Sequence, residues 1–459
     1  MIPIRLIFLC GALLSTSIFG ASDSLVWDEF KPRLAVDMGH LVSGRYYNND
    51  LNMQPLNRNT VILEQHAIYG ENWEFNLGFK GIMWWPFSIN GNEPYQRSFR
   101  IDPRVSEAKA RVNFSAQTQR AYLEFGYFPY KYNPDAQNLG EYLYRSGTYP
   151  GIVQSTDGFR LMDAAVFDAY GMHARFSHFA GIVSHDFTLF TEPSSIPIGD
   201  ITPGYELSVS FPWIQLGAGA AYNRLISFDA SRVRPDVDEN GYFQVDSIFN
   251  VNATTKDTAA IFKGPYGNAS ALVKQKITAG GDSVYSVHAL HHYTQRGIKL
   301  MIRGAVDMGF LLPENLRSPG DLRVFAEAAL LGWENQPYFY EKRSQRMPVM
   351  AGLNLPTFRL LDRLSFQVEY YDNPFLNGKQ FVETAYPIWS DAAADGEYHR
   401  DDWKWSLYAR KTLNRILTIH LQAADDYLRL PLFNYNPSDM ALTQNPKNWY
   451  YLMRLECRL

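Results

Sequence analysis

Histidine is the residue type in this sequence best suited to acid–base chemistry near neutral pH. The candidate catalytic groups are His173, His178, His185, His288, His291 and His292, with Asp168, Asp186 and Ser184 nearby. No lipase elbow, HExxH motif or phosphate-binding loop accompanies them, and the adjacent His291 and His292 would point to opposite faces of a regular strand. We therefore expect no enzymatic activity, no cofactor and no metal.

A second set of chemically distinctive residues consists of charged side chains at alternate positions. Lys109 and Arg111, for example, alternate with Ala110 and Val112. The charged face assigned in this way is richer in basic than in acidic residues, and it comprises Glu74, Lys80, Lys109, Arg111, Glu124, Arg175, Lys299, Arg303, Arg323, Glu327, Arg363, Glu369, Lys404 and Arg410. Such residues either line a water-filled interior or pair across strands, at about 0.2–1 kcal/mol for each pair.

The elements that carry these residues are predicted strands of about ten residues with alternating apolar and polar positions. The clearest segments are residues 72–80, 108–115, 121–127, 363–370, 403–410 and 417–423. Weaker ones are Arg33–Tyr47, Val61–Tyr69, Val166–Ser177, Val183–Thr191, Tyr205–Phe211, Ile214–Asn223, Ser283–His292, Ile298–Met308, Leu322–Trp333 and Pro348–Leu355. Residues 254–263 and 270–276 have weak helical periodicity and receive no predicted element. A soluble, exported all-β protein would alternate in the same way and stays an alternative.

Composition and the N-terminus narrow the class of protein. No stretch beyond the N-terminus approaches the roughly 18 apolar residues that a membrane-spanning helix needs. The net charge is -4 and basic residues are not gathered into a stripe, so nucleic acid is not an expected partner. Arg5, an apolar run to Leu14 and small residues up to Ala21 have the features of a secretory signal. We expect residues 1–21 to be a signal peptide and residues 22–459 to form the mature domain.

The end of the chain and the aromatic pairs point to a membrane. Every other residue from Trp449 to Leu459 is apolar, and the chain stops in mid-pattern, as a closing barrel strand does. Aromatic pairs such as Trp84-Trp85 and Tyr370-Tyr371 at strand ends are typical of the girdles at lipid–water interfaces. The mature sequence therefore resembles bacterial outer-membrane β-barrel proteins, porins among them. Leu459 departs from the aromatic residue that usually ends their last strand.

This resemblance implies an all-β fold, a transmembrane antiparallel up-and-down β-barrel of about 16 strands, with a range of about 14 to 18. It also implies short periplasmic turns, such as Asn414-Arg415, and long extracellular loops. The expected long loops are Trp85–Ser106, Phe128–Met162, Ile226–Gly281, Pro337–Met347, Phe375–Asp402 and Arg429–Lys447. Expected partners are outer-membrane lipid and the barrel assembly machinery, and a trimer is one candidate oligomer.

The segment Tyr130–Phe159 is similar in length and position to the constriction loop that folds into the lumen of general porins. Its candidate site residues are Tyr132, Asp135, Glu141, Tyr142, Arg145 and Tyr149. In an inward loop, Glu141 opposite Arg145 and wall arginines would set a transverse field, and the tyrosines would offer stacking faces to sugar rings. The alternative is an exposed loop without contact to the lumen.

The resemblance implies a passive channel in the bacterial outer membrane for small hydrophilic solutes, with sugars or anions as candidates. The residues expected to line it are Lys80, Lys109, Arg111, Glu124, Arg175, Arg303, Arg323, Glu369, Lys404 and Arg410. Two alternatives remain open at this point. One is a plugged barrel that acts as a surface adhesin or scaffold, and the other is an outer-membrane barrel hydrolase.

Overall fold

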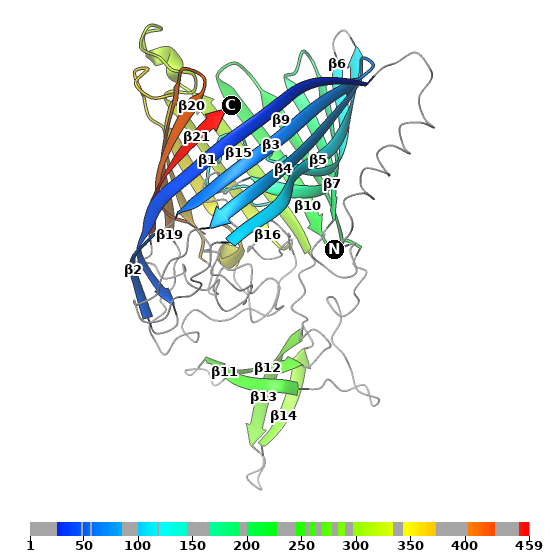
Figure 1. Cartoon of the computed structure of the whole chain (residues 1–459). Helices are drawn as coiled ribbons and strands as arrows, with labels where there is room; N and C mark the ends of the chain where they lie inside the picture. Colours follow the sequence, from blue (N-terminus) through cyan, green and yellow to red (C-terminus); the bar gives the residue numbers. More distant parts are fainter. Residues whose placement is uncertain are drawn as a thin grey trace.

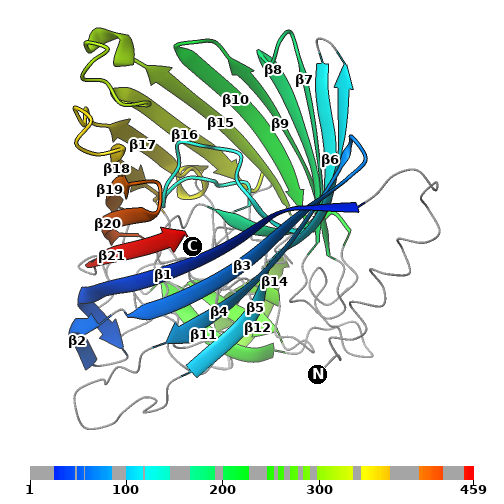
Figure 2. The ribbon, with the colours of Figure 1, turned by 45° about the horizontal axis from the view of Figure 1, so that its top comes forward.

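Sixteen antiparallel strands form a closed barrel in the computed structural model (Figures 1 and 2). The structure describes residues 25–46, 49–55, 57–84, 100–116, 119–144, 166–191, 200–226, 245–252, 257–262, 269–277, 283–289, 297–333, 343–372, 403–426 and 449–458. The expected signal peptide, residues 1–21, lies outside them. Within the described residues, no helix is long and apolar enough to cross a membrane.

The barrel strands follow one another around the ring in sequence order. They are β1 (Leu25–Tyr46), β3 (Arg58–Tyr69), β4 (Trp73–Trp84), β5 (Arg100–Ala116), β6 (Gln119–Tyr130), β7 (Phe167–His178), β8 (Val183–Thr191), β9 (Ile201–Ser210), β10 (Ile214–Asn223), β15 (Gly297–Asp307), β16 (Arg323–Leu331), β17 (Val349–Asn354), β18 (Arg363–Tyr370), β19 (Trp403–Leu413), β20 (Leu417–Asp425) and β21 (Trp449–Arg458). The ring closes where β1 pairs with β21, from Arg33 opposite Arg458 to Ser43 opposite Trp449. β2 (Asn49–Pro55) pairs with the end of β1 as a hairpin arm. The predicted fold and strand number are confirmed.

The short turns lie together at one end of the barrel, which also carries the 15-residue link from β15 to β16. At this end, three-residue and four-residue links join β3 to β4, β7 to β8, β9 to β10 and β19 to β20. Asn414 and Arg415 both have positive φ, of 51° and 60°, which fits the predicted tight turn. The segments joining β4–β5, β6–β7 and β10–β15 lie at the other end. The expected loop Trp85–Ser106 was too long, because β5 already begins at Arg100, and the expected loop Phe128–Met162 was shifted, because β6 continues to Tyr130 and β7 begins at Phe167.

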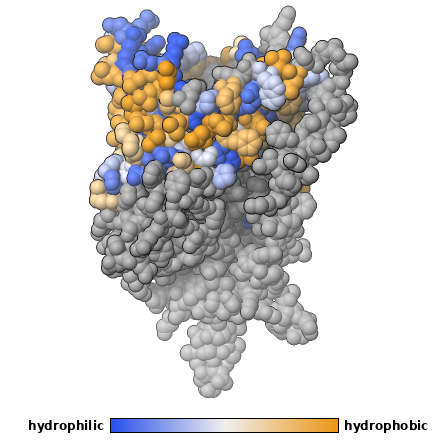
Figure 3. Space-filling view, viewed as in Figure 1, coloured by the Kyte–Doolittle hydropathy of each residue, from blue (hydrophilic) through white to orange (hydrophobic). Residues whose placement is uncertain are grey.

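The outer surface of the barrel is apolar because outward positions alternate with polar inward ones. Ile302 is 65% exposed and Phe187 is 53% exposed, although both are large apolar residues in regular strands. Figure 3 shows such residues gathered into an apolar belt over the visible barrel wall. An exposed apolar surface of this extent is suited to lipid rather than water.

The connection between β10 and β15 contains a separate sheet. Its strands are β11 (Val245–Asn252), β12 (Asp257–Phe262), β13 (Ala269–Ile277) and β14 (Ser283–Ala289), paired in that order. The prediction that residues 283–292 form a barrel strand is therefore wrong, since β14 pairs with β13. The segments with weak helical periodicity are strands as well. Only their backbone pairing separates these four strands from the barrel strands, because the local alternation of a strand does not identify its partner strand.

Excising the connection should leave the barrel intact. β10 and β15 are paired from Ile214–Val306 to Asn223–Gly297, so their register is set without the intervening sheet. We expect a chain in which a short Gly/Ser linker replaces residues 229–294 to refold and to keep a heat-modifiable mobility in detergent gels. Loss of that mobility shift would show that the excised segment is required for barrel assembly.

Candidate functional site

The described part of the loop after β6 lies inside the barrel. We call residues 131–144 the inward loop; Figure 2 shows it crossing the space enclosed by the strands. All of its residues except Lys131 and Pro134 are buried. Its contacts reach β18 and β19, and in the strand order β18 stands halfway around the ring from β6. The inward loop therefore extends from one wall of the lumen to the opposite wall.

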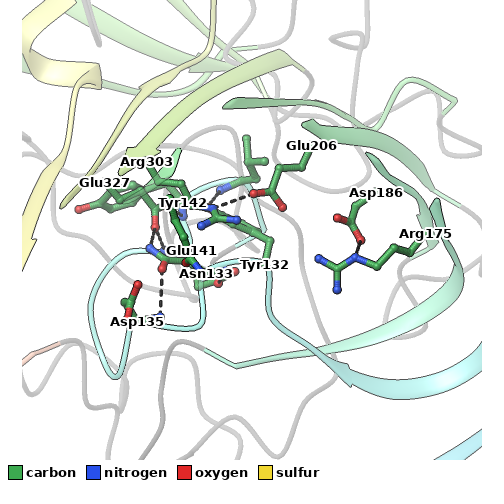
Figure 4. Close-up of polar contacts among 12 residues, drawn as sticks. Tyr132, Asn133, Asp135, Glu141, Tyr142, Arg175, Asp186, Glu206, Arg303 and Glu327 are labelled. Atoms are coloured by element: carbon green, nitrogen blue, oxygen red, sulfur yellow. Dashed lines mark hydrogen bonds and ion pairs between the residues drawn. The ribbon is translucent and has the colours of Figure 1, made fainter. Parts of the chain in front are cut away.

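Glu327 on β16 is the main polar anchor of the inward loop. Its carboxylate accepts hydrogen bonds from the Tyr132 hydroxyl at 2.6 Å and the Asn133 side-chain amide at 2.7 Å. It also accepts the backbone N–H groups of Glu141 at 3.2 Å and Tyr142 at 3.0 Å. Figure 4 shows these loop residues gathered beside Glu327. Charge-assisted hydrogen bonds of this kind are stronger than neutral ones, so one wall carboxylate fixes two points of the loop.

Further polar anchors come from neighbouring strands. Arg323 donates two hydrogen bonds to Asp135, at 2.6 and 2.8 Å. Gln367 on β18 accepts the N–H groups of residues 137 and 138 and donates to the Asp135 carbonyl. The Tyr142 hydroxyl donates to Glu369 at 2.8 Å, and the Lys299 ammonium donates to the Tyr142 carbonyl at 3.0 Å. The buried backbone of the loop is thus paired with wall side chains rather than with another strand.

Apolar packing supports the same docked position. Leu139 of the loop belongs to one buried cluster with Met301, Phe325 and Met350, which point inward from β15, β16 and β17. Gly204 on β9 leaves room for the Tyr144 hydroxyl, since a Cβ there would lie 1.8 Å from it. Apolar side chains therefore fill the wall beneath the loop between the polar anchors.

Glu141 is a buried acid within the loop. One of its oxygens accepts the backbone N–H of Asn133, and the other has no hydrogen-bond partner. Burial and the nearby negative charge of Glu327 raise the pKa of Glu141 well above its ordinary value. The expected pairing of Glu141 with Arg145 falls partly outside the described residues, because Arg145 and Tyr149 lie beyond residue 144.

The raised pKa predicts that acid strengthens loop docking. The docked loop holds the Glu141 proton more tightly than a released loop, so docking is strongest below the ordinary pKa of 4.5. As the pH rises from 4.5 to the raised pKa of Glu141, the free energy of loop docking weakens by about 1.4 kcal/mol for each pH unit. Above the raised pKa it is constant. We expect slower proteolytic cleavage of the loop at acidic pH, with rates normalised to the denatured chain. Glu141→Gln, which resembles the protonated acid, should remove this pH dependence; an unchanged profile would contradict the assignment.

The wall from β19 through β1 to β5 has a different character from the wall under the loop. Some of its inward ionic groups are partly exposed, as in the Arg33–Glu64 pair, whose side chains are 29% and 25% exposed, whereas Asp37 and Lys404 are buried. By contrast, Lys299, Glu327 and Glu369 beneath the loop are 1% exposed or less. The charged side that is accessible to solvent therefore faces the side filled by the loop.

A buried histidine forms the centre of a charged cluster where the loop leaves β6. His173 on β7 contacts Glu124 through Nδ1 and Asp186 through Nε2, both at 2.8 Å. The Tyr130 ring covers it, with ring centroids 4.9 Å apart. A histidine with a carboxylate at each nitrogen donates from both, so it is an imidazolium here. The geometry is that of a structural cation, with no nucleophile in hydrogen-bond contact.

The residues predicted to line the interior separate into two groups. Lys80, Lys109, Arg111, Arg175 and Arg410 are partly or fully exposed. Glu124, Glu369 and Lys404 are buried, and the Arg303 side chain is only 7% exposed. The Arg323 side chain is 14% exposed, as is that of Lys109, but the Arg323 guanidinium is held by Asp135 of the loop. For these residues the structure corrects the expectation of a solvent-exposed lining. Glu124 holds Arg111, and Glu369 and Arg323 hold the inward loop. Lys404 holds Asp425, and Arg303 holds Glu206. Of the loop residues, Tyr132, Asp135, Glu141 and Tyr142 all lie against the wall.

Several residues of the site were missed by sequence reasoning. Glu327 and Lys299 were placed on the inner face by alternation, but nothing in the sequence indicated that they hold a loop. Asn133, Gln367 and Ser406 were not singled out at all, although Gln367 shares its face with Glu369. Among the described residues, no three His, Cys, Asp or Glu side chains gather to hold a metal ion.

Comparison with known proteins gives likenesses to porin structures. No family model and no curated protein matches the sequence. The chain is similar to a mutant of the Rh. blastica porin, with 7% identity and a TM-score of 0.40 over 95% of this chain and 100% of that chain. It is also similar to Salmonella typhi OmpF in complex with daunomycin, with 9% identity and a TM-score of 0.44 over 96% and 99% of the two chains. By its own strand count and closure, the chain is a 16-stranded antiparallel β-barrel of the up-and-down kind.

Proposed function

We propose that this protein is a passive channel of a bacterial outer membrane that admits small hydrophilic solutes. The observation that carries the proposal is the two-sided lumen. The inward loop packs on apolar residues of β15–β17, and the accessible ionic side chains lie on the facing wall. A polar passage between the loop and that wall suits hydrated solutes, and Lys80, Lys109, Arg111, Arg175 and Arg410 are its proposed lining. The inward loop would set its width.

The apolar outer belt supports a position in lipid, and the alternation of inward charge with outward apolar residues is that of membrane barrels. A lipid-facing Arg or Lys near the midplane costs about 2–4 kcal/mol, which favours this orientation over the reverse. Sugars and anions are the proposed solutes, because the accessible side chains combine arginines with the Tyr122 ring, which lies beside Arg111.

Single-channel recording of the refolded protein in a planar bilayer tests the proposal. The expected result is steady ohmic current steps, with a reversal potential in a salt gradient that reports the preferred ion. A protein that shows heat-modifiable mobility and yet passes no current would overturn the channel and would favour a plugged surface barrel.

A further inference from the structure

We propose that the lumen wall at β5–β7 contains a binding subsite for small oxyanions, formed by Arg111, Arg120 and Arg175 around Tyr122. The subsite deepens the proposed channel function, because its ligand would reach it from the lumen. It differs from a general positive charge of the wall in that the Arg111 guanidinium lies over the Tyr122 ring, with Arg175 and Arg120 at neighbouring positions of the same inner face.

Strand register brings these residues together. Tyr122 on β6 lies opposite Arg175 on β7, and Arg111 on β5 lies opposite Glu124, two positions along β6. The Arg111 guanidinium carbon is 4.4 Å from the centroid of the Tyr122 ring. Arg120 is exposed, and its position two residues before Tyr122 places it on the same inner face. Three adjacent strands thus present their cations at one place.

The carboxylates below these arginines are already shared with other cations. Glu124 interacts with Lys109 at 3.5 Å, Arg111 at 2.7 Å and His173 at 2.8 Å. Asp186 interacts with His173 and, at 3.2 Å, with Arg175. The Glu124 and Asp186 side chains are only 6% and 3% exposed, whereas those of Arg111 and Arg175 are 28% and 41% exposed. The layer that meets solvent is therefore cationic.

The remaining nearby acids are also occupied. Glu107 pairs with Lys109 at 2.7 Å, and Glu74 accepts a hydrogen bond from the Asn113 amide at 2.7 Å. Glu206 on β9, which also acts on Arg175, pairs with Arg303 at 2.7 Å. With His173 as an imidazolium, the cluster has six cations, Lys109, Arg111, Arg120, His173, Arg175 and Arg303, and five carboxylates, Glu74, Glu107, Glu124, Asp186 and Glu206. The excess charge belongs to the exposed arginines rather than to the buried residues.

A guanidinium is planar and offers parallel N–H donors that match two oxygens of a phosphate or carboxylate. The exposed edges of Arg111 and Arg175 and the Tyr122 hydroxyl provide donors on both sides of such a ligand. A hydrated monovalent anion such as chloride lacks this match, so the subsite should favour oxyanions over chloride.

The test uses inorganic phosphate with the full-length protein refolded in detergent. Phosphate binding is measured by the broadening of its phosphorus NMR signal, and conductance is recorded on the same preparation. We expect saturable broadening in the native protein and about tenfold weaker binding in Arg175→Gln, since one charge-assisted contact is lost. Arg458→Gln is the matched control, because it removes an exposed arginine from β21 that is not part of the proposed lining. Heat-modifiable mobility verifies that both variants fold.

The outcomes separate the subsite from the channel. Conductance without saturable phosphate binding, or equal losses in the two variants, would overturn the subsite and leave the channel standing. Saturable binding that depends on Arg175 in a protein without conductance would support the subsite and overturn the channel.

Discussion

Replacing Glu327 by alanine is expected to release the inward loop from the wall and to raise the single-channel conductance. The Glu327 carboxylate accepts four hydrogen bonds from the loop, two from backbone N–H groups and two from side chains. A hydrogen bond to a charged acceptor contributes about 1.5–3 kcal/mol, and a buried donor without a partner costs about 1–3 kcal/mol. The combined loss, on the order of several kcal/mol, should favour an undocked loop and a wider, noisier pore.

Glu64→Ala is the matched control for this experiment. Glu64 is also an inward glutamate, but it pairs with Arg33 on β1 and is not in contact with the inward loop. We expect this variant to retain the native conductance level and the native resistance of the loop to proteolysis. If Glu327→Ala also retained both properties, Glu327 would not be the anchor, and the apolar cluster around Phe325 would be sufficient to hold the loop.

Alternation predicted the barrel well because lipid and water impose opposite demands on the two faces of each strand. It placed Arg111, Glu124 and Arg175 inward, and register then explains their contacts. The alternation was weakest where the loop docks. In β16, Phe325 and Ala329 alternate on the inner face with Arg323 and Glu327, which hold the loop, and Val324 and Ala326 face outward. The inner face beneath the loop therefore mixes apolar with charged residues, which weakens the periodic signal there.

The remaining errors have a common physical origin. Residues 283–289 alternate as a barrel strand does, yet they pair with β13, because a local pattern records a half-buried strand and not its neighbour. The docking position of the inward loop was likewise unpredictable. Its contacts with β15 to β19 join residues 157 to 268 apart in sequence, as in Tyr142 with Lys299 and Asn138 with Ser406. Only the order of strands around the ring brings them together.

Replacing Asp37 by alanine is expected to weaken the seam that closes the barrel. In the register, Asp37 on β1 lies opposite Arg454 on β21 and opposite Arg58 on β3. Its carboxylate accepts hydrogen bonds from Arg454 at 2.6 Å and Arg58 at 2.9 Å, and the side chain has no exposed surface. Removing one member of a buried ion pair costs about 3–5 kcal/mol, because the partner charge remains desolvated. Here two guanidinium groups would lose their carboxylate.

The location makes this loss more consequential than a similar one elsewhere. Asp37 and Arg454 are 417 residues apart, so their contact joins the first and last strands only when the whole ring is assembled. We expect Asp37→Ala to lower the temperature at which the compact gel band disappears.

Glu456→Ala is the control on the same seam, since its contacts to Arg33 and Arg458 are both 3.8 Å long and should contribute under about 1 kcal/mol. A second change, Arg454→Met, made on top of Asp37→Ala, should restore part of the lost stability by removing one unpaired charge. Equal melting of the Asp37 and Glu456 variants would instead show that backbone pairing between β1 and β21 closes the barrel without this cluster.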